Sequence, residues 1–148
     1  MKTLIHRAAI AATLGTLMAG SAYAQSVTAL PPVHTSGQVE YMSGGIGKDE
    51  ARAIESASKQ WPLTLEFAVK DKKVADFAAD VNVTVRDRKG HTALQATSDG
   101  PFLLAKLAPG SYTVDATLAG KTLHRKVHVK QGHMAKAVFE WPAGTDQG

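Results

Sequence analysis

The chain of 148 residues contains no cysteine. Disulfide bonds, thiolate metal sites, a cysteine nucleophile and a lipid-bearing N-terminal cysteine are therefore excluded. Long hydrophobic runs are also lacking: the apolar run over residues 8–19 is shorter than the ~20 residues that a membrane-spanning helix needs. What the chain does have, 44% hydrophobic and 20% charged residues, is typical of one globular domain.

The beginning of the chain has the three parts of a secretory signal peptide. Lys2 and Arg7 precede the apolar run, and Ala22-Tyr23-Ala24 forms a small-x-small cleavage pattern before Gln25. A membrane anchor would need a longer run, and a core helix would not explain why both charges precede it. The sequence therefore predicts a signal peptide over 1–24, cleavage after Ala24 and a periplasmic or secreted protein without a transmembrane segment.

The chain has only a small excess of basic over acidic residues. Lys and Arg number 17 and Asp and Glu 13, and the first 24 residues hold two of the basic residues and none of the acids. Residues 25–148 therefore carry a formal net charge of +2. Since nucleic-acid binding needs a concentrated basic face, we expect no nucleic-acid partner.

One helix is predicted near the middle of the N-terminal half. Ala51, Ile54, Ala57 and Trp61 recur at helical spacing and form one apolar stripe, and Pro62 forbids continuation. We place the helix over 48–61, packed on the rest of the domain. It follows an extended N-terminal segment over 25–47, which contains a short strand over 38–42 and a glycine-rich turn over 43–47.

From residue 62 the period changes to that of strands. Alternating segments are separated by glycines at positions 90, 100, 110, 120 and 132, which we interpret as hairpin turns that need a positive φ. Residues 71–76 are predicted to be a charged connection. The fold class is mainly β: a seven-stranded antiparallel β-sandwich over 62–142 with one N-terminal α-helix and a C-terminal tail over 143–148. The seven strands are expected over residues 63–69, 79–87, 91–97, 102–107, 111–118, 121–130 and 134–141.

Strand parity then predicts the core. The residues expected to point inward are Leu65, Phe67, Val81, Val83, Val85, Leu94, Phe102, Leu104, Leu107, Tyr112, Val114, Leu118, Val127, Val129, Val138 and Trp141. Trp61 and Trp141 each precede a proline at the end of an element, so we expect them to seal the sandwich. Stacking on sugars is the alternative for these two rings.

The most chemically distinctive segment is 121–136, which has five Lys or Arg residues, while no acid occurs between Asp115 and Glu140. On a strand His124, Lys126 and His128 share one face. The two histidines would lie ~13 Å apart, too far to ligate one metal ion. Two interpretations remain open: a pH-sensitive surface for an anionic partner, or a solvated strand whose charges discourage edge aggregation.

No catalytic set is recognisable. The chain lacks Gly-x-Ser-x-Gly and His-Glu-x-x-His, and nothing in it indicates a cofactor or a metal. The loop over 44–48 could present N–H groups to an anion, but it is no P-loop because Asp49 follows Lys48. We therefore predict a non-catalytic protein, with an enzyme whose site is assembled from distant residues as the less favoured alternative.

Four local signatures stand out over residues 81–141: the strand and turn over 83–90, the turn over 97–102, the segment over 107–114, and the last two strands around residues 131–132. On these signatures the segment resembles the carboxypeptidase regulatory-like (transthyretin/prealbumin-like) domain family. The third is the most specific, since Leu-Ala-Pro-Gly-Ser-Tyr-Thr-Val matches the family's Leu-x-Pro-Gly-x-Tyr-x-Val.

The resemblance implies a compact seven-stranded sandwich that serves packing, interaction or sugar contact without catalysis. The prealbumin-like group also includes a purine-pathway hydrolase, whose terminal Tyr-Arg-Gly-Ser is absent here, so that activity is not implied. We therefore expect a periplasmic binding or interaction module whose partner is an envelope protein. The alternative is a binder of anionic ligands or polysaccharide that uses the basic strand over 121–130, namely His124, Lys126 and His128.

Overall fold

The computed structural model describes residues 30–71 and 75–147. The predicted signal peptide over 1–24 lies outside the described residues. Within them, no helix combines the length and the apolar character needed to cross a membrane. The elements are β1 (His34–Ser36), β2 (Val39–Gly44), α1 (Lys48–Ser58), β3 (Leu63–Lys70), β4 (Ala75–Phe77), β5 (Val81–Asp87), β6 (Thr92–Ser98), β7 (Phe102–Ala105), β8 (Gly110–Leu118), β9 (Lys121–Val129), β10 (Ala135–Trp141) and the 3-10 helix η1 (Thr145–Gln147).

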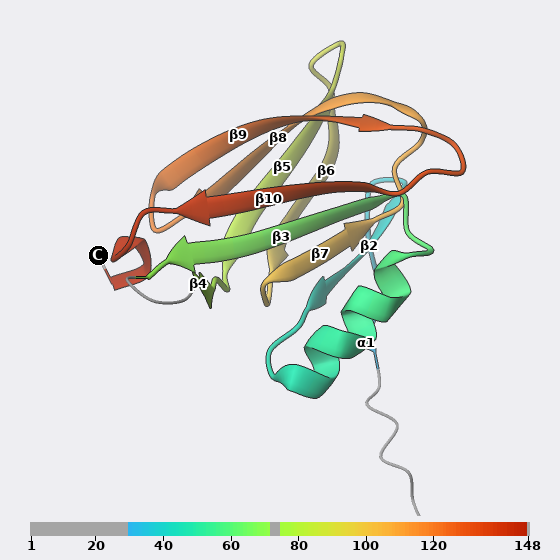
Figure 1. Cartoon of the computed structure of the whole chain (residues 1–148). Coiled ribbons are helices and arrows are strands. Elements are labelled where there is room, and N and C mark those ends of the chain that lie inside the picture. The colour runs from blue at the N-terminus through green and yellow to red at the C-terminus, as the bar shows by residue number, and fades with distance from the viewer. Residues whose placement is uncertain (1–29, 72–74, 148) are drawn as a thin grey trace, which may run out of the picture.

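The strands form two facing sheets (Figure 1). A six-stranded sheet has the order β1-β2-β7-β3-β10, with β4 also paired to β3, and a four-stranded sheet has the order β6-β5-β8-β9. The prediction of a mainly β, sandwich-like chain with one α-helix is confirmed. The predicted count of seven strands is wrong, and so is the wholly antiparallel pairing, because β10 runs parallel to β3.

Two of the additional strands, β1 and β4, are very short. β1 lies in the segment predicted to be extended, and β4 includes residues from the predicted charged connection. Both are three residues long and pair through their backbones with β2 and β3. Because a three-residue strand is too short to show alternation, nothing in its side-chain pattern separates it from a loop.

The main core fills the space between the sheets. Its fully buried side chains include Phe67, Leu94, Phe139 and Trp141, and most of the predicted inward residues belong to it. Val138 is a wrong prediction, because it is 47% exposed while Phe139 is completely buried. Residues 139 and 141 share the inner face of β10, and strand parity turns residue 138 outward.

A second, smaller core lies between the six-stranded sheet and α1. It contains Met42, Ile54, Trp61, Phe102 and Leu104. The predicted apolar stripe of the helix is therefore confirmed. Strand β7 is buried on both of its faces, since Leu103 and Ala105 belong to the main core while Phe102 and Leu104 contact the helix side.

Side chains close both open sides of the sandwich. At one side, the Ser36 hydroxyl donates to the Gln95 carbonyl at 3.1 Å, which links β1 to β6. At the other, the indole N–H of Trp141 donates to the Lys121 carbonyl at 2.9 Å. The Arg125 guanidinium lies 5.7 Å from the centre of the Phe139 ring and covers the core between β9 and β10.

A candidate binding face on the four-stranded sheet

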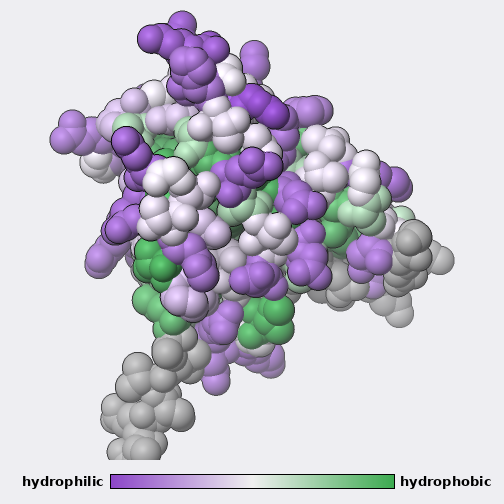
Figure 2. All heavy atoms as spheres, turned by 180° about the vertical axis from the view of Figure 1, so that it is seen from behind, coloured by the Kyte–Doolittle hydropathy of each residue, from purple (hydrophilic) through white to green (hydrophobic). Residues whose placement is uncertain are grey.

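The outer face of the four-stranded sheet is polar throughout. Strands β5, β6, β8 and β9 alternate, and their outward side chains are half-buried or exposed. Seen from behind in Figure 2, hydrophilic and neutral colours predominate over the middle of the molecule. We call this surface the polar face; its residues are Asn82, Thr84, Arg86, Gln95, Thr97, Ser111, Thr113, Asp115, Thr117, Thr122, His124, Lys126 and His128.

A two-residue turn fixes the register of β8 and β9. Ala119 and Gly120 have φ values of 47° and 78°, as the tight hairpin turns that suit the twist of strands require. Leu118 therefore faces Lys121, and the same register places Asp115 opposite His124. One row further from the turn Thr113 faces Lys126, and beyond it Ser111 faces His128.

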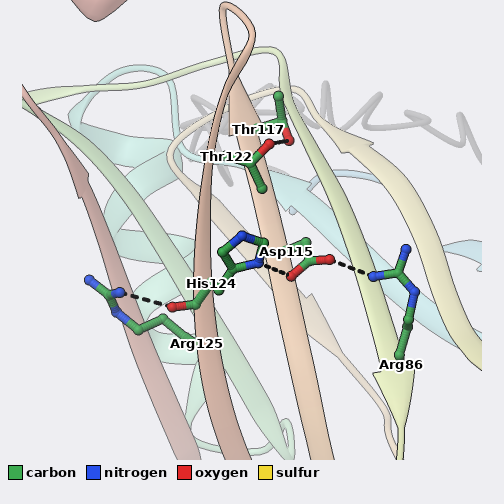
Figure 3. Close-up of polar contacts among 6 residues, drawn as sticks. All are labelled: Arg86, Asp115, Thr117, Thr122, His124 and Arg125. Carbon is green, nitrogen blue, oxygen red and sulfur yellow. Dashed lines mark hydrogen bonds and ion pairs between the residues drawn. The ribbon is translucent and has the colours of Figure 1, made fainter. Parts of the chain in front are cut away.

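Asp115 is the centre of a small ion-pair network on this face (Figure 3). Its carboxylate lies 2.5 Å from Nδ1 of His124 and forms an ion pair with Arg86 from β5. Partial burial raises the pKa of Asp115, but hydrogen bonds and charges from His124 and Arg86 lower that pKa below its ordinary value. In the next row, the Thr117 and Thr122 hydroxyls are 2.7 Å apart.

A hollow of about 510 Å³ lies at the other end of the polar face. Its walls include Arg88, Tyr112, Lys126 and His128, with Asp87 as its one acid. Nδ1 of His128 is 2.8 Å from the Ser111 hydroxyl. The volume is in the range of small-ligand sites.

The Tyr112 hydroxyl donates to the Ala108 carbonyl at 2.6 Å. Burial and the Asp87 carboxylate both raise the pKa of Tyr112, so the phenol stays neutral. The Asp87 carboxylate is itself held in the β5–β6 turn, where it accepts hydrogen bonds from the N–H groups of Lys89 and His91, each at 2.9 Å.

The three residues predicted from the sequence are together on the polar face, but they are not equivalent. His124 is held by Asp115, whereas Lys126 and His128 line the hollow. Among the described residues, the side chain of Lys126 makes no ion pair or hydrogen bond. The role of Asp115 was not predicted, because this residue lies on β8, outside the basic segment over 121–136. The Ala119-Gly120 turn is the signal that would have placed it opposite His124.

Among the described residues we find neither a metal-binding cluster nor a hydroxyl nucleophile beside His124. Within residues 30–71 and 75–147, no group of three His, Cys, Asp or Glu side chains could hold a metal ion. The His124–Asp115 pair resembles the base and orienting acid of a catalytic triad. Yet no hydroxyl in the described part of the chain is hydrogen-bonded to the imidazole of His124.

In the glycine-rich loop before α1, one backbone N–H group is hydrogen-bonded to a side chain of α1. The Gly45 N–H donates to Oε1 of Glu50 at 2.8 Å, so the carboxylate of the helix itself occupies the position considered for an anion.

Compared with known proteins, the chain matches no protein-family model and no curated protein.

Proposed function

We propose that the protein is a non-catalytic binding module of the carboxypeptidase regulatory-like type, exported to the periplasm or beyond. Its partner on the polar face is an anionic polysaccharide. The observation that carries the proposal is the hollow lined by Lys126 and His128, in which Lys126 has no acidic partner among the described residues.

The polar face offers the groups that a charged sugar needs. Its Ser, Thr, Asn and Gln side chains both donate and accept hydrogen bonds, as sugar hydroxyls do. Lys126 supplies a positive charge for a carboxylate or sulfate group. Arg86 and Asp115 neutralise each other, so the net positive charge gathers at the hollow.

Binding should strengthen in acid. A protonated imidazole carries a positive charge and donates from both ring nitrogens. At His128 such a charge would lie beside Lys126 in the hollow and strengthen the attraction of an anion. The charged groups that face His128 in the hollow are Lys126, Arg88 and the Asp87 carboxylate.

The test is retention of the protein on immobilised polygalacturonate, with dextran as the uncharged polymer. We expect retention that falls with added salt and is stronger in mildly acidic than in neutral buffer. The double variant K126Q/H128Q should lose it. K48Q, which removes an exposed cation at the start of α1, should not. Equal retention of the wild type and the double variant would refute the proposed site.

Export has its own test. The N-terminal sequence of the protein isolated from the native cell envelope should begin at Gln25. A sequence that begins at Met1 would contradict signal cleavage. The absence of catalysis is tested by a broad substrate screen, in which turnover abolished by a single substitution would contradict a pure binding role.

A further inference from the structure

A pair of hollows lies around the end of α1. The first, about 220 Å³, is lined by residues in or next to α1, β3, β7 and β10, among them Lys59, Thr64, Phe102 and Met134. The second, about 340 Å³, shares Lys59 and Met134 with the first. We call the two together the helix groove.

The floor of the first hollow contains a buried hydroxyl without a partner. Thr64 is 3% exposed, and its Oγ1 makes no hydrogen bond within the described part of the protein. Thr64 points to the outer face of β3, between its sheet neighbours Leu104 and Lys136. A buried hydroxyl left without a hydrogen bond costs about 1–3 kcal/mol, so a bound group that accepts from it would recover stability.

The charged groups of the groove are mostly positive. Lys59, Lys130 and His133 line the second hollow together with no acid. In the first hollow, Lys136 is neutralised by Glu66 at 2.8 Å, and Glu55 is the only carboxylate among the lining residues. Among the described residues, Lys59 has neither an ion pair nor a hydrogen bond through its side chain.

Apolar side chains form part of the groove, beside the polar residues Ser58, Gln60 and Gln131. Trp61 and Leu107 are buried in the wall of the second hollow, while Met134 is 49% exposed at the junction of the two. Methionine is flexible and polarisable, so it adapts to the shape of an apolar group. A ligand with an apolar body and a negative end would therefore match both properties of the groove.

We propose that the helix groove binds a small amphiphilic carboxylate. Its carboxylate accepts a hydrogen bond from the Thr64 hydroxyl and pairs with Lys59, and its aliphatic part lies against Met134 and Trp61. Lys59 is suited to this role because it belongs to both hollows. Thr64 lies on the six-stranded sheet and Lys59 follows α1, and neither residue lines the hollow of the polar face.

Titration of the full chain with hexanoate, followed by amide NMR shifts, tests the proposal. We expect saturable shifts around residues 59–64 and 134–136, and much weaker ones with hexylamine or hexan-1-ol. T64V should weaken hexanoate binding about 2–10-fold, since the net contribution of one hydrogen bond is ~0.5–1.5 kcal/mol. K59Q should weaken it about tenfold or more, because a charged partner is lost.

Two controls separate binding from folding. K48Q removes a cation from the other end of the same helix and should leave the hexanoate affinity unchanged. T64V should unfold at the same urea concentration as the wild type or a higher one, because it removes an unpaired buried hydroxyl.

Three outcomes would overturn the proposal: no saturable shift at the groove, equal binding of hexanoate and hexan-1-ol, or an unchanged affinity in both T64V and K59Q. Shifts confined to the polar face would also overturn it, while leaving the proposed function intact.

Discussion

Replacing Gly100 by alanine tests how closely β2 and the β6–β7 turn approach each other. A Cβ at this position would lie 2.4 Å from the Gly44 carbonyl oxygen and 2.9 Å from the Gly44 Cα. Real Cβ atoms essentially never come closer than 3.0 Å to a neighbour, so the two backbones must separate by about 0.6 Å in a close-packed region. Glycine is therefore required at position 100 because the Gly44 backbone leaves no room for a side chain. The sequence had instead suggested a turn with a positive φ at this position.

The expected cost follows from what that separation disturbs. Overpacking of a tight interior costs about 1–3 kcal/mol. The same movement strains the hydrogen bond from the Asp99 N–H to the Ser43 hydroxyl, now 3.1 Å, whose net value is ~0.5–1.5 kcal/mol. We expect G100A to lower the free energy of unfolding by about 2–4 kcal/mol, measured by urea titration.

Gly90 provides the matched comparison, because it has a φ of 83° and no atom near its absent Cβ. Asparagine tolerates this backbone conformation better than alanine, so G90N should be more stable than G90A. At Gly100 the order should reverse, with G100N less stable than G100A, since only size matters there. A loss below about 0.5 kcal/mol in G100A, the usual range of surface substitutions, would refute the reasoning.

Two further predictions concern the sheets. D115N should lower stability by about 1 kcal/mol at neutral pH, a modest value because His124 is 68% exposed. Since the folded pKa of Asp115 is lowered, its stabilisation is complete above the ordinary value of 3.8 and is lost as the pH falls through the folded pKa. Urea titrations of D115N and wild type should therefore converge in acid, and an equal gap at neutral and acidic pH would contradict the ion pairs. F139A should cost about 3–5 kcal/mol in the same assay. V138A should stay within about 0.5 kcal/mol, and a larger loss in V138A than in F139A would reverse our assignment of the inner face of β10.

Local patterns predicted much of the fold because they depend on neighbouring residues. Alternation correctly predicted that Val81, Val83 and Val85 point into the core, and helical spacing correctly predicted that Ile54 lies on the buried face of α1. Pro62 predicted the end of the helix to within a few residues, since α1 ends at Ser58. In β10 the apolar residues 137, 138 and 139 are consecutive, so alternation alone could not decide which of them pointed inward.

The features that were missed depend on contacts between distant segments. β7 is buried on both faces because α1 covers its outer side, which no pattern within four residues can indicate. His124, Lys126 and His128 lie on one face, as predicted. The groups that contact the two histidines come from β8, and Arg86 of β5 completes the ion-pair network. The helix groove joins residues of α1, β3 and β10, and the unpaired Thr64 hydroxyl becomes visible only after these elements pack.

The parallel pairing of β10 with β3 also constrains the order in which the domain is built. The two strands are separated by roughly 70 residues of chain, and such distant pairings slow folding. Phe139 and Trp141, which are completely buried, enter the core only with β10. Phe67 therefore lacks both of its aromatic neighbours in the core until β10, the last strand of the chain's two sheets, has joined β3.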